Sequence, residues 1–401
     1  MTSPDIEVGL TDEDRAVTAT ARRFATDVLR PTGRDLDRLA DPAQVIAADS
    51  PLWDVFARHR ELGLDAVTAD ENLDEVAKAR LMCIVNEELA WGDVGLAISV
   101  GLAQFHQPWV QMSGDTELIE RFVSPQRPTI GCWALTEPDH GSDTVGDPDF
   151  YLADTARRPN CIARSDGADF VISGQKAAWV SNGSIADIAV LFCAFDPGDG
   201  ALGGSVFLVP TDLAGVERPA PLDKLGQRPL NQGEIFFDDV RVPASHRVIP
   251  PEMYQLALEG MLAYANSAMG QLFVGVARAA YEMALDYSKE RIQGGKAIFE
   301  HQSVRGRLFK MFQQVEASRA LARRVAYHNA ASPPPLLPHA IATKVFCTQA
   351  AFDVASAAVQ IFGGNGLSRE YPIEKVLRDA RSSLIEDGCN EMLALVGGAK
   401  L

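Results

Sequence analysis

The sequence predicts an α+β protein of several domains, in which a helical part, a β part and a second helical part follow one another. Both end parts have the composition and spacing of helices, whereas short apolar runs bounded by Gly, Asp and Pro lie between them. The chain has 401 residues, which corresponds to two or three domains at roughly 150 residues each. Hydrophobic residues make up 47% of it, so it can bury a sizeable core.

The first helical part starts with a marked helix N-terminus. Thr11 is a suitable N-cap, Asp14 follows three residues later, and apolar residues at 17–28 repeat on one helical face. Pro31 follows this pattern and is expected to end the helix. Further along, the stretch 81–90 has the composition of a largely buried helix.

The middle part consists of short apolar runs that have the length of strands. They are rich in β-branched and aromatic residues and are separated by turn residues, which predicts a small all-β domain. The runs are 170–172, 188–195, 205–209 and 233–243.

The remainder of the chain is expected to be helical and to contain no strand. The stretches 253–291 and 301–328 are long and rich in Ala, Leu and Met, as helices prefer. A loop at 332–335 precedes another helix from about His339 to Phe362. Gly363 would end that helix, because glycine tolerates the left-handed conformation of a helix C-terminus.

Charge and composition exclude several classes of function. Lys and Arg number 37 and Asp and Glu 54, so the formal net charge is -17, which disfavours nucleic acid and anionic membranes. No apolar run approaches the roughly 18 residues of a membrane span, and the N-terminus lacks the pattern of a signal peptide. The six cysteines have no metal-ligand spacing and are expected to be buried thiols. We therefore expect a soluble cytoplasmic protein that binds no metal.

Three stretches have patterns that point to chemistry when taken together. They are a turn-rich segment at 132–143, a strand-like segment at 174–183 and a glycine-containing segment that leads on to 388. Separately, they are typical of a turn, of a hairpin at Asn182 and Gly183, and of a helix C-cap followed by a salt-bridged amphipathic helix. Their order and spacing make three unrelated coincidences improbable.

In this combination the chain resembles the acyl-CoA dehydrogenase family of flavoproteins over essentially its whole length. The family's Thr-Glu-Pro-x-x-Gly-Ser-Asp turn matches 136–143, and its Lys-x-x-Trp-Val-Ser-Asn-Gly type of segment matches 176–183. Its Gln-x-x-Gly-Gly-x-Gly turn matches 360–366. Two further landmarks are Val240-Arg-Val-Pro243, and Arg291 followed by His301-Gln302.

The resemblance implies a fold and a cofactor. It implies a helical N-terminal domain at 1–130, a β-barrel-like middle domain at 131–246 and a C-terminal four-helix bundle at 247–401, with FAD held between them. It places the following residues at the cofactor: Trp133, Leu135, Thr136, Ser142, Trp179, Val180, Ser181, Arg291, Gln302, Gln360, Gly363, Gly364, Cys389 and Glu391. Ser142, Asn266 and Gly388 would bind the substrate.

Individual roles follow from the same resemblance. Thr136 would bond the pyrimidine side of the flavin, Trp179 would stack near the isoalloxazine, and the hydroxyl of Ser181 would donate near flavin N5. Arg291 and Gln360, with the two glycines, resemble the set that reaches the FAD pyrophosphate of a neighbouring subunit. The chain is then expected to form a homo-oligomer, as a dimer of dimers, and to pass electrons to an electron-transfer flavoprotein or a similar acceptor.

The expected reaction is the α,β-dehydrogenation of an acyl thioester, for which a carboxylate must take the α proton in a dry pocket. The family usually has Glu at the position that Asp387 occupies here, and Tyr at the position of Glu386, which would point elsewhere. Some members carry the base on the first helix of the bundle, but an ungapped count places Ala265 there, with Ala263 and Asn266 where Asp and Arg are common. Asp387 is therefore the expected base.

Other departures concern the substrate and adenine ends of the site. Gly294 replaces a Phe and Cys389 replaces a Thr, and the segment 144–169 is longer than usual and is expected to form an extra loop. His140 is expected to be solvated or bonded to backbone, with a contact to substrate or carrier as the alternative. Because Asp is about 1.5 Å shorter in reach than Glu, a bulky acyl group is expected.

Two other functions fit the same residues. One is a flavoenzyme on this scaffold with different chemistry, either oxygen-dependent or linked to an acyl-carrier protein. The other is a non-catalytic subunit that pairs with a homologous chain.

Overall fold

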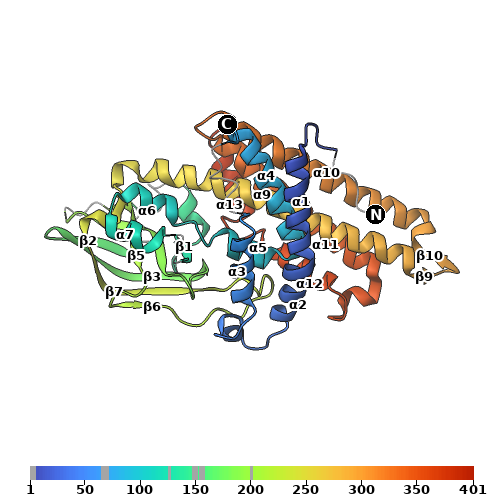
Figure 1. Ribbon diagram of the computed structural model, residues 1–401, viewed down its shortest axis with the longest axis horizontal. Helices are drawn as coiled ribbons and strands as arrows, with labels where there is room; N and C mark the ends of the chain where they lie inside the picture. Colours follow the sequence, from blue (N-terminus) through green and yellow to red (C-terminus); the bar gives the residue numbers. More distant parts are fainter. Residues whose placement is uncertain (1–5, 65–71, 125–127, 147–151, 153–158, 199–201) are drawn as a thin grey trace.

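The computed structural model describes residues 6–64, 72–124, 128–146, 152, 159–198 and 202–401. A β-sheet forms one end of the molecule, and long C-terminal helices extend from it to a small hairpin at the opposite end (Figure 1). The N-terminal helices pack across the middle of these long helices. The order helical, β, helical is the one that the sequence predicts.

The N-terminal part is helical throughout its described residues apart from the connecting turns. Its α-helices are α1 (Asp12–Phe24), α2 (Arg30–Asp37), α3 (Leu52–Glu61), α4 (Glu75–Gly92), α5 (Val94–Gly101), α6 (Gln107–Ser113) and α7 (Thr116–Phe122). The predicted capping box is present, because Thr11 Oγ1 accepts from the Asp14 N–H and Asp14 Oδ2 accepts from the Thr11 N–H. The predicted buried helix at 81–90 lies within α4.

Pro31 does not end the first helix, so that expectation is wrong. One π turn at Ala25–Leu29 joins α1 directly to α2, and the Arg30 N–H donates to the carbonyl of Ala25. A wider turn shifts the carbonyl positions ahead of the proline, which relieves the clash that a Pro ring makes in a regular α-helix. The helical course therefore continues to Asp37.

The sheet contains each of the four predicted runs as a strand. Its strands are β1 (Gly131–Ala134), β2 (Ile162–Asp166), β3 (Asp169–Ser181), β4 (Ile188–Asp196), β5 (Gly203–Pro210), β6 (Val216–Glu217), β7 (Gln232–Val242) and β8 (Arg247–Ile249). The strand order is β6-β7-β3-β2-β4-β5-β8, and β1 pairs in parallel with β4. Part of the segment expected to be an extra loop is therefore strand β2; residues 147–151 and 153–158 lie outside the described part.

The Asn-Gly turn after β3 does not make a hairpin. Asn182 has φ 60°, as such a turn requires, but β2 lies between β3 and β4 in the sheet. The Asn182 side chain is instead buried against α5, where it accepts from Ser99 Oγ at 2.7 Å and donates to the Ser99 carbonyl at 2.8 Å. The turn residue thus anchors the sheet to the N-terminal helices.

The C-terminal part is a bundle of long helices. Its elements are α9 (Pro251–Glu290), β9 (Ile292–Gln293), β10 (Lys296–Ala297), α10 (Gln302–Ala331), α11 (Leu337–Phe362), α12 (Ile373–Ser382) and α13 (Asn390–Gly398). The expectation of no strand beyond residue 250 is wrong at β9 and β10, which pair across Gly294 and Gly295. This hairpin is mostly exposed, so it has no apolar run that could reveal it. Gly363 ends α11 at φ 62°, as predicted.

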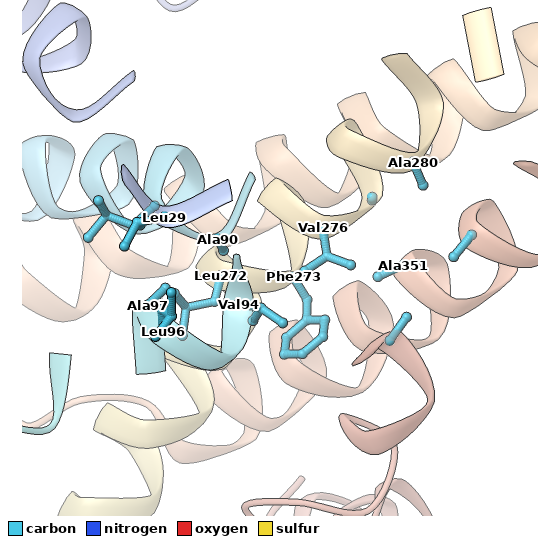
Figure 2. Packing of buried hydrophobic residues seen from close by; sticks show 14 of the residues in the cluster. Leu29, Ala90, Val94, Leu96, Ala97, Leu272, Phe273, Val276, Ala280 and Ala351 are labelled. Atoms are coloured by element: carbon cyan, nitrogen blue, oxygen red, sulfur yellow. The ribbon is translucent and has the colours of Figure 1, made fainter. Parts of the chain in front are cut away.

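One core cluster joins the N-terminal helices to the bundle. Side chains from the first helices, α4 and α5 meet those of α9 and α11, and Phe273 at the centre is fully buried (Figure 2). The labelled members are Leu29, Ala90, Val94, Leu96, Ala97, Leu272, Phe273, Val276, Ala280 and Ala351. This packing fixes the bundle against the N-terminal helices and so positions the loops at its ends.

The segment Leu337–Leu367 is long and apolar enough to cross a membrane by length and composition, with a mean hydropathy of 1.4. Polar and charged residues, among them Lys344 and Asp353, interrupt this segment, so it is not an unbroken apolar run. Half of the tested window is buried inside the fold, and α11 packs against α9, α10, α12 and α13. Its apolar character is explained by its place in the core.

Candidate functional site

The candidate site lies where the sheet meets the loop between α12 and α13. Ser142, in the turn after β1, accepts a hydrogen bond at 2.9 Å from the backbone N–H of Cys389. This bond joins the Thr-Glu-Pro turn to the loop that carries Asp387. Two segments separated by more than two hundred residues in sequence are thereby brought together, as the resemblance implies.

A buried ion pair that sequence reasoning did not single out holds the Thr-Glu-Pro turn. Lys176 Nζ lies 2.7 Å from Glu137 Oε1 and 2.8 Å from the Leu135 carbonyl oxygen, and both charged side chains are fully buried. Burial by itself would lower the pKa of Lys176, but the Glu137 carboxylate holds it above its usual value. The next N–H, of Ala177, donates to the Thr136 carbonyl at 2.9 Å. The turn is thus fixed to β3 by the Lys176 side chain and by the backbone N–H of Ala177.

Trp179 and Ser181 present a surface that suits a flavin. The Trp179 side chain is 59% exposed, which is unusual for so large an apolar group. Ser181 Oγ accepts from Gln232 Nε2 at 3.1 Å, and Gln232 Oε1 accepts from Lys224 Nζ at 2.7 Å. Since its oxygen is an acceptor in this chain, the Ser181 hydroxyl hydrogen is free to donate to a bound group. A flat exposed ring beside a directed donor fits FAD.

Lys224 and Gln232 are thus candidate site residues that sequence reasoning missed. They precede and begin β7, and neither lies in one of the three quoted motifs. Only the pairing of β3 with β7 brings Gln232 opposite Ser181. No local pattern could have shown this.

The remaining residues predicted in the Thr-Glu-Pro turn and in β3 pack inside the sheet domain. Leu135 and Val180 are buried at 7% and 2% exposure, and the Trp133 ring packs against Phe192 with 6.0 Å between centroids. His140 is buried and not solvated, and its Nδ1 lies 2.7 Å from Asp143 Oδ2. This contact stiffens the turn that carries Thr136 and Ser142.

The Asp387 loop has a backbone shape that its sequence favours. Asp387 has φ 52° and Gly388 has φ 90°, in the left-handed region that Asp tolerates and Gly adopts freely. Lys344 of α11 donates to the Gly388 carbonyl at 2.7 Å and to Asn390 Oδ1 at 2.8 Å. The loop is therefore tied to the bundle by a lysine as well as to the turn by Cys389.

The pKa values of two ionisable groups at this loop, Asp387 and Lys344, are shifted towards neutral pH. Burial raises the pKa of the Asp387 carboxyl, against the opposing effect of the Lys344 cation. Burial also lowers the pKa of Lys344 to about 8. A carboxylate with a raised pKa is a better proton acceptor, which is the property that a general base needs.

Glu386 is bonded on the side of the sheet domain, which agrees with the expectation that it points elsewhere than Asp387. Gln227 Nε2 donates to Glu386 Oε1 at 2.6 Å, and Gln227 lies in the same segment before β7 as Lys224. Burial and the charge of Asp387 raise the pKa of Glu386 to about 7. Two neighbouring carboxyls of the loop thus face opposite sides, Asp387 towards Lys344 and Glu386 towards the sheet domain.

A second group of predicted cofactor residues lies at the other end of the bundle, around the β9–β10 hairpin (Figure 1). The Tyr287 ring stacks on Phe362 with 4.0 Å between centroids and so joins the ends of α9 and α11. The members of this group are all exposed; they are Arg291, Gln302, Gln360, Gly363 and Gly364. Within one chain they are far from the Asp387 loop.

The last predicted residues differ in how far they are exposed. Glu391 is exposed in the first turn of α13, and Cys389 is half-buried. Asn266 is fully buried within α9, where its Nδ2 donates to the Leu262 carbonyl at 2.9 Å. Ala263 is also buried, so this part of α9 presents small or internally bonded side chains.

Comparison with known proteins gives a consistent result over the chain. Family models described as the N-terminal, middle and C-terminal domains of acyl-CoA dehydrogenase match residues 11–126, 132–240 and 255–401. Benzylmalonyl-CoA dehydrogenase of Aromatoleum aromaticum is 31% identical over 98% of this chain and 98% of that protein. Cyclohexane-1-carbonyl-CoA dehydrogenase of Geobacter metallireducens is 29% identical over 96% of both. The solved structure of butyryl-CoA dehydrogenase from Megasphaera elsdenii has a TM-score of 0.83 at 27% identity and covers 98% of this chain and 99% of that one.

Proposed function

Because the chain belongs to the acyl-CoA dehydrogenase family and is an FAD-dependent oxidoreductase, we propose that it oxidises the Cα–Cβ bond of an acyl-CoA with Asp387 as the base. The observation that supports this most is the hydrogen bond between Cys389 and Ser142, which holds the Asp387 loop against the turn that carries Thr136. The raised pKa of Asp387 supports the same role. Asp387→Asn, argued in the Discussion, tests it.

Each group on the chain then has a task in the reaction. FAD, when bound, supplies the acceptor for the β hydride. Asp387 takes the α proton, and Lys344 holds the loop that carries it. Lys224 and Gln232 orient the Ser181 hydroxyl so that it donates towards the cofactor. The buried pair of Lys176 and Glu137 keeps the neighbouring turn in place.

We expect bulky acyl-CoA substrates to be preferred over straight-chain ones. Asp387 is one methylene shorter than the usual Glu, and a misplacement of about 1 Å can cost about 100-fold in rate. A branched or alicyclic acyl group would fill the wider gap. The two relatives named for benzylmalonyl-CoA and cyclohexane-1-carbonyl-CoA agree with this proposal.

Anaerobic flavin bleaching with a panel of linear, branched and alicyclic acyl-CoAs measures this preference. We expect higher kcat/KM for alicyclic or branched acyl groups than for linear ones with the same number of carbons. Equal or better rates with linear chains would contradict the proposal. Reoxidation by an electron-transfer flavoprotein, compared with oxygen, then identifies the acceptor; slow reaction with oxygen is expected for a dehydrogenase.

We also propose that Arg291 and Gln360 bind the FAD of a neighbouring subunit in a homo-oligomer. Both are exposed at the end of the bundle that carries the β9–β10 hairpin, and this placement supports a contact with the cofactor of another subunit. Arg291→Ala is expected to weaken FAD retention without changing the fold. Gel filtration with light scattering and flavin content measures both properties, and a monomer that keeps full FAD would refute the proposal.

A further inference from the structure

Three rings and one amide, the Asn365 cluster (Tyr287, Phe362, Asn365 and Tyr371), hold the turn that follows α11. Asn365 Nδ2 donates to the hydroxyl oxygen of Tyr287 at 3.0 Å and to that of Tyr371 at 3.3 Å. Tyr287 lies in the last turn of α9, and Tyr371 lies just before α12. One side chain of the turn therefore links two segments that are far apart in sequence.

The same cluster fixes the end of α11. The Tyr287 hydroxyl donates at 3.3 Å to the carbonyl of Phe362, the last residue of that helix. Carbonyls in the last turn lack partners within a regular helix, so the tyrosine supplies one. The Tyr287 ring also stacks on Phe362, and the Tyr371 ring meets Phe362 edge-on with 5.7 Å between centroids. The turn is thus held at its start by Phe362 and at its end by Tyr371.

Two glycines between these anchors face open space. A Cβ added at Gly363 or Gly364 would meet no described atom of another part of the chain within 4 Å. A Cβ at Gly366, in contrast, would lie 2.7 Å from the Val359 carbonyl oxygen. The turn therefore has a packed side and an open side, and the backbone on the open side is accessible to a group from outside the chain.

We propose that Asn365 is a positioning residue for the cofactor of a neighbouring subunit, because it holds the backbone at 363–364 in the shape that receives the diphosphate of that FAD. The inference rests on the proposed function, in which Arg291 and Gln360 bind the FAD of a neighbouring subunit. Gln360 precedes the glycines in the same turn region, and Arg291 follows Tyr287 by one helical turn.

The physical reason is the cost of ordering a glycine turn. Glycine has more conformational freedom than any other residue, so a turn of glycines that is not held loses much entropy when it binds a ligand. Backbone N–H groups bind phosphate oxygens well only when they already point the same way. The hydrogen bonds of Asn365 order the turn before the cofactor arrives, which lowers this cost.

Equilibrium dialysis of the purified flavoprotein against graded FAD and, in parallel, against FMN tests the inference. FMN has the same isoalloxazine but lacks the diphosphate and the adenosine, so its binding reports only the part of the site at Thr136 and Ser181. We expect Asn365→Ala to weaken FAD binding about fivefold to tenfold, the effect of one or two hydrogen bonds, and to leave FMN binding unchanged. A general loss of structure would weaken the binding of both flavins alike.

Tyr→Phe variants show whether the cluster acts as a unit. Tyr287→Phe and Tyr371→Phe keep the rings and remove the two hydroxyls that Asn365 contacts. In the chain that carries both, Asn365→Ala should weaken FAD binding by less than about twofold further, because its partners are already gone. Tyr281→Phe, earlier on α9, is the matched control; the Tyr281 ring packs against Phe312 with 6.1 Å between centroids, and FAD affinity should not change.

Unchanged FAD affinity in Asn365→Ala, or equal losses of FAD and FMN, would overturn the inference. Arg291→Ala separates this failure from a failure of the proposed function. If Arg291→Ala weakens FAD binding and Asn365→Ala does not, only the role of Asn365 is wrong; if neither does, the contact with a neighbouring subunit's FAD is wrong as well. Light scattering on the same samples reports assembly, and dissociation of Asn365→Ala into monomers would also overturn the inference, since the turn would then hold the subunits rather than the cofactor.

Discussion

Replacement of Asp387 by Asn is expected to slow flavin reduction by acyl-CoA by about 10²–10⁴-fold, the usual contribution of a general base. Asn has nearly the same shape and cannot accept the α proton, so the loss reports chemistry. FAD should stay bound, because the contacts of Thr136 and Ser181 with their neighbours do not involve Asp387. Anaerobic stopped-flow absorbance measures the rate, and the flavin spectrum of the purified variant measures FAD content.

Asp387→Glu provides the complementary measurement. It adds the methylene that most family members have at this position and should shift the preference towards slimmer acyl chains. The left-handed backbone at φ 52° is less favourable for Glu than for Asp, so some loss of stability is expected as well. If Asp387→Asn retained near-normal turnover, the base would lie elsewhere and the interpretation of this pocket would be wrong.

The sequence was sufficient for the order of the parts and for the local segments of the site. The capping box at Thr11, the four apolar runs and the glycine stop at Gly363 are short-range signals, and each is present in the structure. The predictions failed where contacts between residues distant in sequence determine the structure. Asn182 makes a turn but no hairpin, because the preceding strand β2 lies between β3 and β4 and the Asn182 side chain bonds to Ser99 in α5.

For the site, too, the local motifs were predicted from the sequence and the long-range contacts were not. Motifs located the turn at Thr136 and the loop at Asp387 correctly as neighbours, since Ser142 and Cys389 are bonded. Lys224 and Gln227 contact other side chains of the site, Gln232 and Glu386 respectively. Both come from a segment that contains no motif. Their importance depends on strand pairing and helix packing, which spacing along the chain does not encode.

Removal of the buried lysine of the sheet is expected to have the largest effect on stability. Lys176→Met keeps most of the side-chain length but leaves Glu137 buried without its cation and the Leu135 carbonyl without this donor. Breaking a buried ion pair from one side costs about 3–5 kcal/mol. The turn with Thr136 and Ser142 should loosen at the same time, so FAD should dissociate more readily.

Thermal unfolding followed by circular dichroism, together with FAD release followed by fluorescence, measures both effects. Lys78→Met is the matched control, because Lys78 pairs with Glu75 at 2.8 Å, where Glu75 is 67% exposed, and such surface pairs contribute less than about 1 kcal/mol. Adding Glu137→Gln to Lys176→Met should recover part of the loss, since it removes the uncompensated charge. If Lys176→Met unfolded at the same temperature as Lys78→Met, the buried pair would not be what holds the turn.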